Sequence, residues 1–389
     1  MNIILCVIDT LRYDYIRAHG VNDWIETPNL DRLASKSIVF DRAYSASYPT
    51  VPHRTDLMTG EYAWPYQGPF HPWMPLRFDA PTLPRLLFRE GYATQLIHDT
   101  PHLVNGGHAF DWPFAAWTFV RGAEVDRPWI DDKQLQSLTN WGTDPLFDFV
   151  DEDALSDGER RLLMTYGRAN RRRETWEDWN TAQLFSKGAQ FLRDNASRGD
   201  RREGSFFLWL DCFDPHEPWD VPPEFVKRYD RTPGYDGRVD PRAFTSAARR
   251  AKDGVFPDGV RERQTAFYAA KVSWVDHWFG QVLDALEETG LDEKTAIVLT
   301  ADHGTNLGER GGFGLVLGVA RNVNPDEMRR NGADVVVADL GDLLPQKKSL
   351  QAFQQVRRLG KPSDEQPARG NLGGDRRMAL HLFDGSFFL

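Results

Sequence analysis

Short apolar runs recur along the first three hundred residues, and each one ends at a polar or glycine-containing turn. The run at residues 3–8 is continuous and partly β-branched, which is typical of a strand buried on both faces. The same reasoning predicts strands at residues 37–44, 92–97, 205–211 and 295–301, the last of them buried. Helical spacing predicts helices at 27–34, 50–60, 82–89, 181–196 and 261–288. This alternation predicts an α/β fold with a large, mostly parallel sheet flanked by helices.

Polar residues follow two of the predicted strands directly. Asp9 and Thr10 come after the first strand, and Asp302 and His303 come after the strand at 295–301. Sites in open α/β sheets gather at the carboxyl ends of strands. A carboxylate and an imidazole placed there are good ligands for a divalent ion. The alternative for Asp9 is a residue that caps the start of a loop.

The stretch from Ser45 to Gly60 is read as a small, polar loop that leads into a helix. Pro52 would occupy the first turn, so Thr50 is predicted as the N-cap. Its hydroxyl would lie at the positive end of the helix dipole, where an anionic ester is also attracted, and Arg54 lies one turn further on. The alternative is an ordinary capped helix with no chemical role.

The composition of the chain limits which binding partners and which cellular compartment we expect. The chain has 389 residues, of which 41% are hydrophobic and 27% are charged, and its formal net charge is −10. The negative charge argues against nucleic-acid binding as the main task. Two cysteines, Cys6 and Cys212, fit a reducing compartment. Neither a signal peptide nor a run long enough to span a bilayer is visible, so we expect a cytoplasmic protein without a membrane partner.

The sequence Thr50-Val-Pro-His-Arg-Thr-Asp-Leu-Met-Thr-Gly60 resembles the sulfatase signature, in which Cys/Ser-x-Pro-x-Arg is followed by Leu-x-Thr-Gly. The resemblance implies a fold of the alkaline-phosphatase type, with Thr50 as the nucleophile and Arg54 as its support. Sulfatases convert Cys or Ser to formylglycine, which is not possible for Thr. Thr nucleophiles occur elsewhere in the superfamily, among phosphodiesterases and phosphonate hydrolases.

The resemblance also implies a metal site. Asp9 matches the first metal ligand of the family, and Asp302-His303 matches the second ligand pair. Thr10 stands where sulfatases often carry another Asp, so it would be a weaker oxygen ligand or none. The implied cofactor is a divalent ion: Ca, Mg, Mn or Zn.

Two histidines are candidates for contact with the substrate. The segment Asp214-Pro-His-Glu-Pro resembles the Pro-His-x-Pro segment of the family, which implies that His216 contacts the anionic ester. His102 resembles the end of another family segment, and it is either a substrate contact or an ordinary loop histidine. Asp211 and Asp214 are possible ligands of a second metal, which their spacing does not decide.

The resemblance covers residues 1–314, which we interpret as one domain. Leu315 stands where the family usually has a substrate-contacting Lys. Residues 315–345 resemble the last β-α-β of the β-phosphoglucomutase-like phosphatases of the haloacid dehalogenase superfamily, and 346–389 form a polar tail that is predicted to be disordered. We therefore expect a C-terminal side that is truncated or replaced in a fused gene product. The alternative is an ordinary C-terminal subdomain of the family.

The predicted function is a metal-dependent, sulfatase-like hydrolase of phosphate, phosphonate or sulfate esters, acting on a small anionic ester. The alternative is a degenerate, non-catalytic domain. The leaving group, the number of metals and the oligomeric state are left open.

Overall fold

The computed structural model describes most of the first 307 residues and little beyond them. The described residues are 1–40, 43–45, 47–63, 73–126, 165–167, 169–170, 172–196, 204–233, 259–305, 307 and the short segments 315–319, 335–337 and 379–382. The chain divides into a unit over residues 1–308 and a second unit over 309–385.

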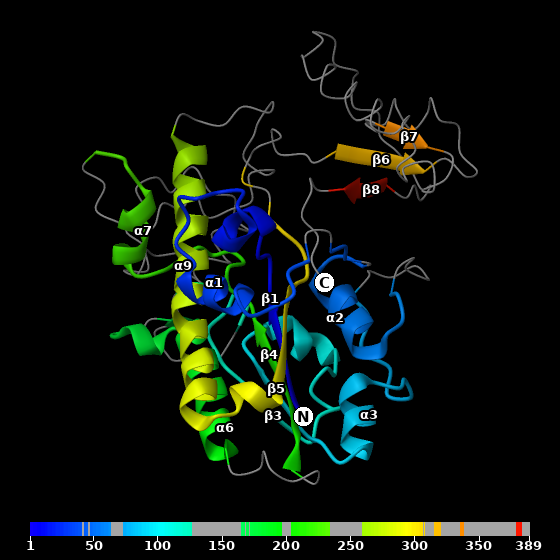
Figure 1. Ribbon diagram of the computed structural model, residues 1–389. Coiled ribbons are helices and arrows are strands. Elements are labelled where there is room, and N and C mark those ends of the chain that lie inside the picture. The colour runs from blue at the N-terminus through cyan, green and yellow to red at the C-terminus, as the bar shows by residue number, and fades with distance from the viewer. Residues whose placement is uncertain are drawn as a thin grey trace, which may run out of the picture. The chain divides into compact units, whose positions relative to one another are not determined.

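The first unit is built on a five-stranded sheet (Figure 1). Its strands are β1 (Asn2–Ile8), β2 (Ala93–His98), β3 (Ala116–Phe119), β4 (Phe206–Cys212) and β5 (Thr295–Ala301). They run in the order β3-β2-β4-β1-β5, and every pairing is parallel. The predicted α/β fold with a parallel sheet is confirmed.

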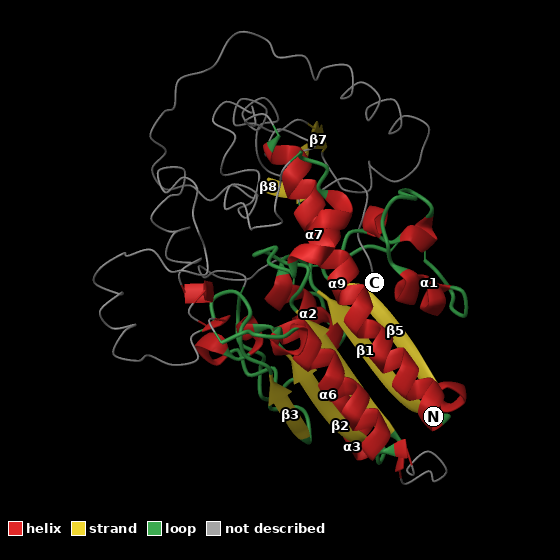
Figure 2. Cartoon of the chain, turned by 90° about the vertical axis from the view of Figure 1, so that its left-hand side faces the viewer, coloured by secondary structure: helices red, strands yellow, loops and turns green. Residues whose placement is uncertain are grey.

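Helices cover both faces of this sheet (Figure 2). The α-helices are α1 (Pro28–Ala34), α2 (Thr50–Thr59), α3 (Leu83–Arg89), α6 (Asn180–Asp194), α7 (Pro223–Tyr229) and α9 (Val260–Thr289). Short 3₁₀ helices are Tyr13–Tyr15, Arg17–His19, Pro101–Leu103, Asn105–Gly107, Trp176–Asp178 and Asp292–Lys294. The predicted helices are therefore present within a few residues of their expected bounds.

Strand β1 shows why two helical layers are needed. Its alternate residues Ile4, Cys6 and Ile8 pack into a core with α6 and α9. Leu5 and Val7 point to the opposite face and pack into a second core with α2 and α3. Side chains alternate between the faces of a strand, so an uninterrupted apolar run requires cover on both sides.

Three local expectations were wrong. Residues 37–40 are not a strand, and Ala43 forms only a single bridge. Strand β3 was not expected. Strand β5 is less buried than its apolar sequence predicts, with Val298 49% exposed, because it is an edge strand of the described sheet.

The second unit contains a three-stranded sheet of β6 (Leu315–Val319), β7 (Val335–Val337) and β8 (Ala379–Leu382). Strand β6 pairs parallel with β7 and antiparallel with β8. The two strands expected within residues 315–345 are therefore present, while the helix between them lies outside the described residues. Most of the tail at 346–389 also lies outside them, and the domain boundary at residue 314 stays a prediction.

Among the helices that the structure describes, none combines the length and the apolar character needed to cross a bilayer.

Candidate active site

The parallel register of the sheet places the polar residues that follow β1 and β5 side by side. Ile8 pairs with Ala301, so Asp9 and Asp302 both follow at the same sheet edge. The Asp302 Oδ1 atom accepts hydrogen bonds from the backbone N–H of Thr10, at 3.0 Å, and of His303, at 2.7 Å. The two strand ends are thereby joined by a carboxylate rather than by solvent.

Asp9, Asp302 and His303 form a buried cluster whose ligating atoms all lie within 4.8 Å of one another. Among the described residues, neither the carboxylate oxygens of Asp9 nor Nε2 of His303 has a hydrogen-bond partner, although Asp9 Oδ2 is ion-paired with Arg54. The Nδ1 atom of His303 lies 2.9 Å from the Gly304 carbonyl oxygen. A carbonyl can only accept, so the proton is on Nδ1 and the lone pair on Nε2. This donor set fits a divalent cation.

The two carboxylates repel each other when both are charged. Burial and the neighbouring Asp302 raise the pKa of Asp9. Burial also opposes the ionisation of Asp302, but Arg54 and His303 outweigh it and hold the pKa of Asp302 well below its usual range. A bound cation would relieve the repulsion.

Thr10 adopts a backbone conformation that is unusual for its residue type. Its φ is +54°, in the left-handed region that costs a β-branched residue roughly 1–3 kcal/mol. Besides the N–H bond to Asp302, the Thr10 carbonyl accepts a hydrogen bond of 2.7 Å from the Tyr268 hydroxyl. The Thr10 Oγ1 atom is buried without a hydrogen bond beside the cluster. The role of Thr10 as a weak ligand stays a prediction.

Arg54 is fully buried among three carboxylates. Its Nε and Nη2 atoms donate to Asp211 at 3.2 and 3.0 Å, as a two-pronged pair. The Nη2 atom also lies 3.1 Å from Asp9 Oδ2, and Nη1 donates to Asp302 Oδ2. Arg54 thus holds the carboxylates of Asp9, Asp211 and Asp302 together and supplies positive charge to the site.

Thr50 is the first residue of α2 and not its N-cap, so the predicted cap was wrong by one residue. The cap is Pro49, whose carbonyl accepts the first helical hydrogen bond from His53 N–H at 3.1 Å. No side chain caps this helix end. The Thr50 side chain is 3% exposed, and its hydroxyl is not used as the cap.

His216 follows β4 and carries positive charge. Its Nδ1 atom lies 3.2 Å from Glu124 and from Glu217, and its ring stacks on Phe213 with centroids 4.4 Å apart. Burial opposes the charged form, yet Glu217 and Glu124 raise the pKa of His216 well above its usual value. Such an imidazolium suits contact with an anion.

A model of the sulfatase family matches residues 1–350 of the chain. The chain belongs to the sulfatase family. The resemblance drawn from the motif at Thr50 and from the strand-end residues is therefore confirmed at the level of the family.

The proteins similar to this sulfatase-family chain carry the names of different kinds of hydrolase. It is 24% identical over 345 residues to iduronate 2-sulfatase of Mus musculus, with 80% of this chain and 56% of the relative covered. It is 24% identical over 347 residues to the multifunctional alkaline phosphatase superfamily protein PehA of Trinickia caryophylli, with 79% and 64% covered. The solved phosphonate monoester hydrolase SpPMH from Silicibacter pomeroyi aligns with a TM-score of 0.52 and 26% identity, with 80% and 64% covered. The chain spans 56–64% of the length of these proteins.

In this sulfatase-family chain, His102 borders a cavity of about 520 Å³. Its ring meets Trp73 and Phe213 edge-on, with centroids 4.6 and 5.6 Å away. Burial and the neighbouring His216 lower the pKa of His102 to about 3, so this imidazole is neutral. His102 and His216 thus contact the same ring of Phe213. Contact of His102 with a substrate stays a prediction.

Asp211 and Asp214 were considered as possible ligands of a second metal. In the structure, both carboxylates are paired with positively charged side chains of the protein. Asp211 binds Arg54, and it also accepts hydrogen bonds from Thr100 at 2.7 Å and from Trp209 Nε1 at 3.1 Å. Asp214 Oδ1 lies 3.0 Å from the ammonium of Lys271, a buried residue of α9. The charge that a second metal would supply comes from these two side chains.

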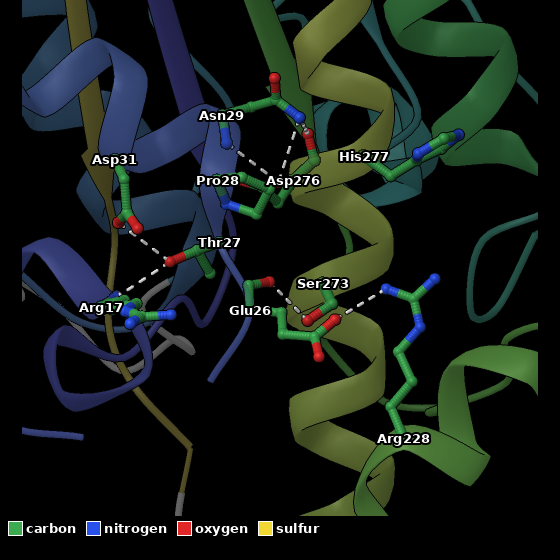
Figure 3. Close-up of a pocket in the computed structure, with 10 residues that line it drawn as sticks. All are labelled: Arg17, Glu26, Thr27, Pro28, Asn29, Asp31, Arg228, Ser273, Asp276 and His277. Atoms are coloured by element: carbon green, nitrogen blue, oxygen red, sulfur yellow. Dashed lines mark hydrogen bonds and ion pairs between the residues drawn. The ribbon is translucent and has the colours of Figure 1, made fainter. Parts of the chain in front are cut away.

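A second cavity, of about 290 Å³, lies where α1, α7 and α9 meet (Figure 3). Asp276 accepts hydrogen bonds there from the backbone N–H groups of Asn29 and Leu30, at 3.2 and 2.7 Å. Glu26 and Arg228, which both line the cavity, form an ion pair at 3.0 Å. These contacts join the helices, and none of the cavity's lining residues belongs to the cluster of Asp9, Asp302 and His303.

Sequence reasoning missed His53 and Glu124. His53 follows Thr50 by three residues, and such a pair shares one face of a helix, so this spacing was an available signal. Glu124 comes from a segment without periodicity, and only the folded chain brings it to His216.

Proposed function

We propose that this chain is a metal-dependent hydrolase of phosphate, phosphonate or sulfate esters that uses Thr50 as its nucleophile. One observation carries the proposal. Among the described residues, Asp9 and His303 present buried ligand atoms without hydrogen bonds next to the Asp302 carboxylate. Arg54 lies beside them, one turn into the helix that Thr50 begins. The names of the relatives, a sulfatase and a phosphonate monoester hydrolase, support the ester classes.

A divalent ion bound by Asp9, Asp302 and His303 would polarise the ester and lower the pKa of a nearby hydroxyl. The chain's own residues do the remaining work. Thr50 attacks the central atom of the ester in line with the leaving group. His216, held as the imidazolium by Glu124 and Glu217, binds the anionic oxygens. The covalent ester on Thr50 is then hydrolysed by water.

A second function, binding of an anionic ester without turnover, is favoured by the position of Arg54. Its guanidinium lies against Asp9, Asp211 and Asp302 and offsets part of their negative charge without a metal. A domain that had lost its chemistry would keep its fold through these ion pairs. The two functions differ in whether the purified chain holds a metal.

The first test is metal content per purified chain, measured by elemental analysis in the wild type and in Asp302→Ala. We expect metal in the wild type and its loss in the variant, because Asp302 supplies a ligand. Asp79→Ala, a change at an exposed carboxylate outside the site, is the control and should keep its metal. A wild type without metal after dialysis against Mn, Ca or Zn would remove the hydrolase proposal.

The nucleophile is tested with nitrophenyl esters of sulfate, phosphate and phenylphosphonate. Thr50→Ala should abolish turnover, because no other group would form the covalent ester. Thr55→Ala is the matched control on the same helix, where the hydroxyl only bonds the Val51 carbonyl at 3.0 Å. Turnover by Thr50→Ala at the wild-type rate would contradict the assignment.

A further inference from the structure

His53 is a buried imidazole in the site that neither the motif nor the proposed mechanism employs. It lies in the first turn of α2, three residues after Thr50, and is 2% exposed. Residues three apart are neighbours on a helix surface. Its Nδ1 atom is 2.8 Å from Ser45 Oγ, and its Nε2 atom is buried without a hydrogen bond among the described residues.

The hydrogen bonds of Ser45 determine which nitrogen of His53 carries the proton. A serine hydroxyl has one proton, and Ser45 donates it to the Ser47 carbonyl at 2.8 Å. The Ser45 oxygen must therefore accept from His53, so the proton is on Nδ1. Burial lowers the pKa of His53 to about 4, which keeps the ring neutral at pH 7. The Nε2 atom is thus a buried lone pair without a donor.

His53 lies within electrostatic range of the cluster but is not part of it. Asp302, Arg54 and His303 all contribute electrostatically to the pKa of His53. The described groups whose ligating atoms lie mutually within 4.8 Å are Asp9, Asp302 and His303, and His53 is not among them. Atoms that share one small cation must lie about that close. A neutral imidazole lone pair that is not part of such a set can accept a proton from a hydroxyl.

We propose that His53 Nε2 is the general base for Thr50, a role that rests on the proposed function. The Thr50 O–H bond breaks and its proton moves to Nε2 while the oxygen bonds to phosphorus or sulfur. The leaving oxygen departs with the electron pair of its bond. When water cleaves the covalent ester, His53 returns the proton to Thr50, and the proton lost by water goes to the released alkoxide through solvent.

The test compares His53→Gln with His98→Gln. His98 is a matched control, because it is also buried, with Nδ1 3.2 Å from a carbonyl oxygen and Nε2 without a hydrogen bond, and it is stacked on Phe119. We expect kcat to fall about 10²–10⁴-fold in His53→Gln and to change little in His98→Gln. Metal content and the urea midpoint are measured for each variant. Ser45→Ala keeps the ring but removes the acceptor for Nδ1–H, and we expect a smaller fall.

A second readout is labelling of Thr50 by a fluorophosphonate, followed by mass spectrometry. Labelling should slow in His53→Gln in parallel with kcat, because the same proton is removed. A folded, metal-containing His53→Gln variant with wild-type kcat and labelling would overturn the role as a base. Loss of metal along with activity would make His53 a ligand instead. A wild type that neither turns over nor labels would end the proposed function, and this role with it.

Discussion

The ion pair between Lys271 and Asp214 gives the sharpest test of how this fold is stabilised. The two side chains are 1% and 5% exposed, and Nζ lies 3.0 Å from Oδ1 and 2.9 Å from the Asp220 carbonyl oxygen. Lys271→Met keeps the length of the side chain but leaves the Asp214 carboxylate buried, with Thr181 as its one side-chain donor among the described residues. Removing one partner of a buried pair costs about 3–5 kcal/mol. That is a large part of the 5–15 kcal/mol typical of a folded domain.

The assay is urea unfolding followed by tryptophan fluorescence, since Trp274 and Trp278 of α9 are buried in the same core. We expect a lower midpoint at an unchanged slope. Adding Asp214→Asn to Lys271→Met should recover part of the loss, because the uncompensated charge is then gone. Arg77→Met, which removes an exposed ion pair with Asp79, should leave the midpoint unchanged. A loss below about 1 kcal/mol, or strict additivity of the two buried changes, would refute the reasoning.

Three further predictions follow from burial and charge. Gly280→Ala should lower the free energy of unfolding by about 1–3 kcal/mol, because the added methyl would lie 2.7 Å from the Asn29 side chain. Urea unfolding measures this loss in the wild-type background and in the Asn29→Ala background. An equal loss in the two backgrounds would contradict the clash. Cys6 and Cys212 should not react with a thiol reagent in the native protein, since both are buried with raised pKa values, and both should react in urea. The raised pKa of His216 predicts that KM for an anionic ester rises as pH increases through that pKa, because the imidazolium is lost; His216→Gln should remove this dependence, and an identical profile in the variant would contradict it.

Local sequence patterns correctly predicted those helices and strands that are buried along most of their length. The apolar runs of β1, β2 and β4 and the amphipathic spacing of α6 and α9 were sufficient, because each of these elements packs against the core along most of its length. The failures are elements whose state depends on neighbours. Strand β3 is four residues long and partly exposed, and β5 has an apolar sequence but lies at an edge of the described sheet.

At the site, the sequence by itself predicted Asp9, Asp302 and His303 as a group, because strand ends of a parallel sheet meet at one edge. It also indicated Thr50 and Arg54 through the family motif, and so the family to which the chain belongs. Only the tertiary structure decided which charged side chains pair with one another. It paired Asp211 with Arg54, Asp214 with Lys271 and His216 with Glu124. Spacing along the chain does not carry that information, since these contacts join residues 57 to 157 positions apart.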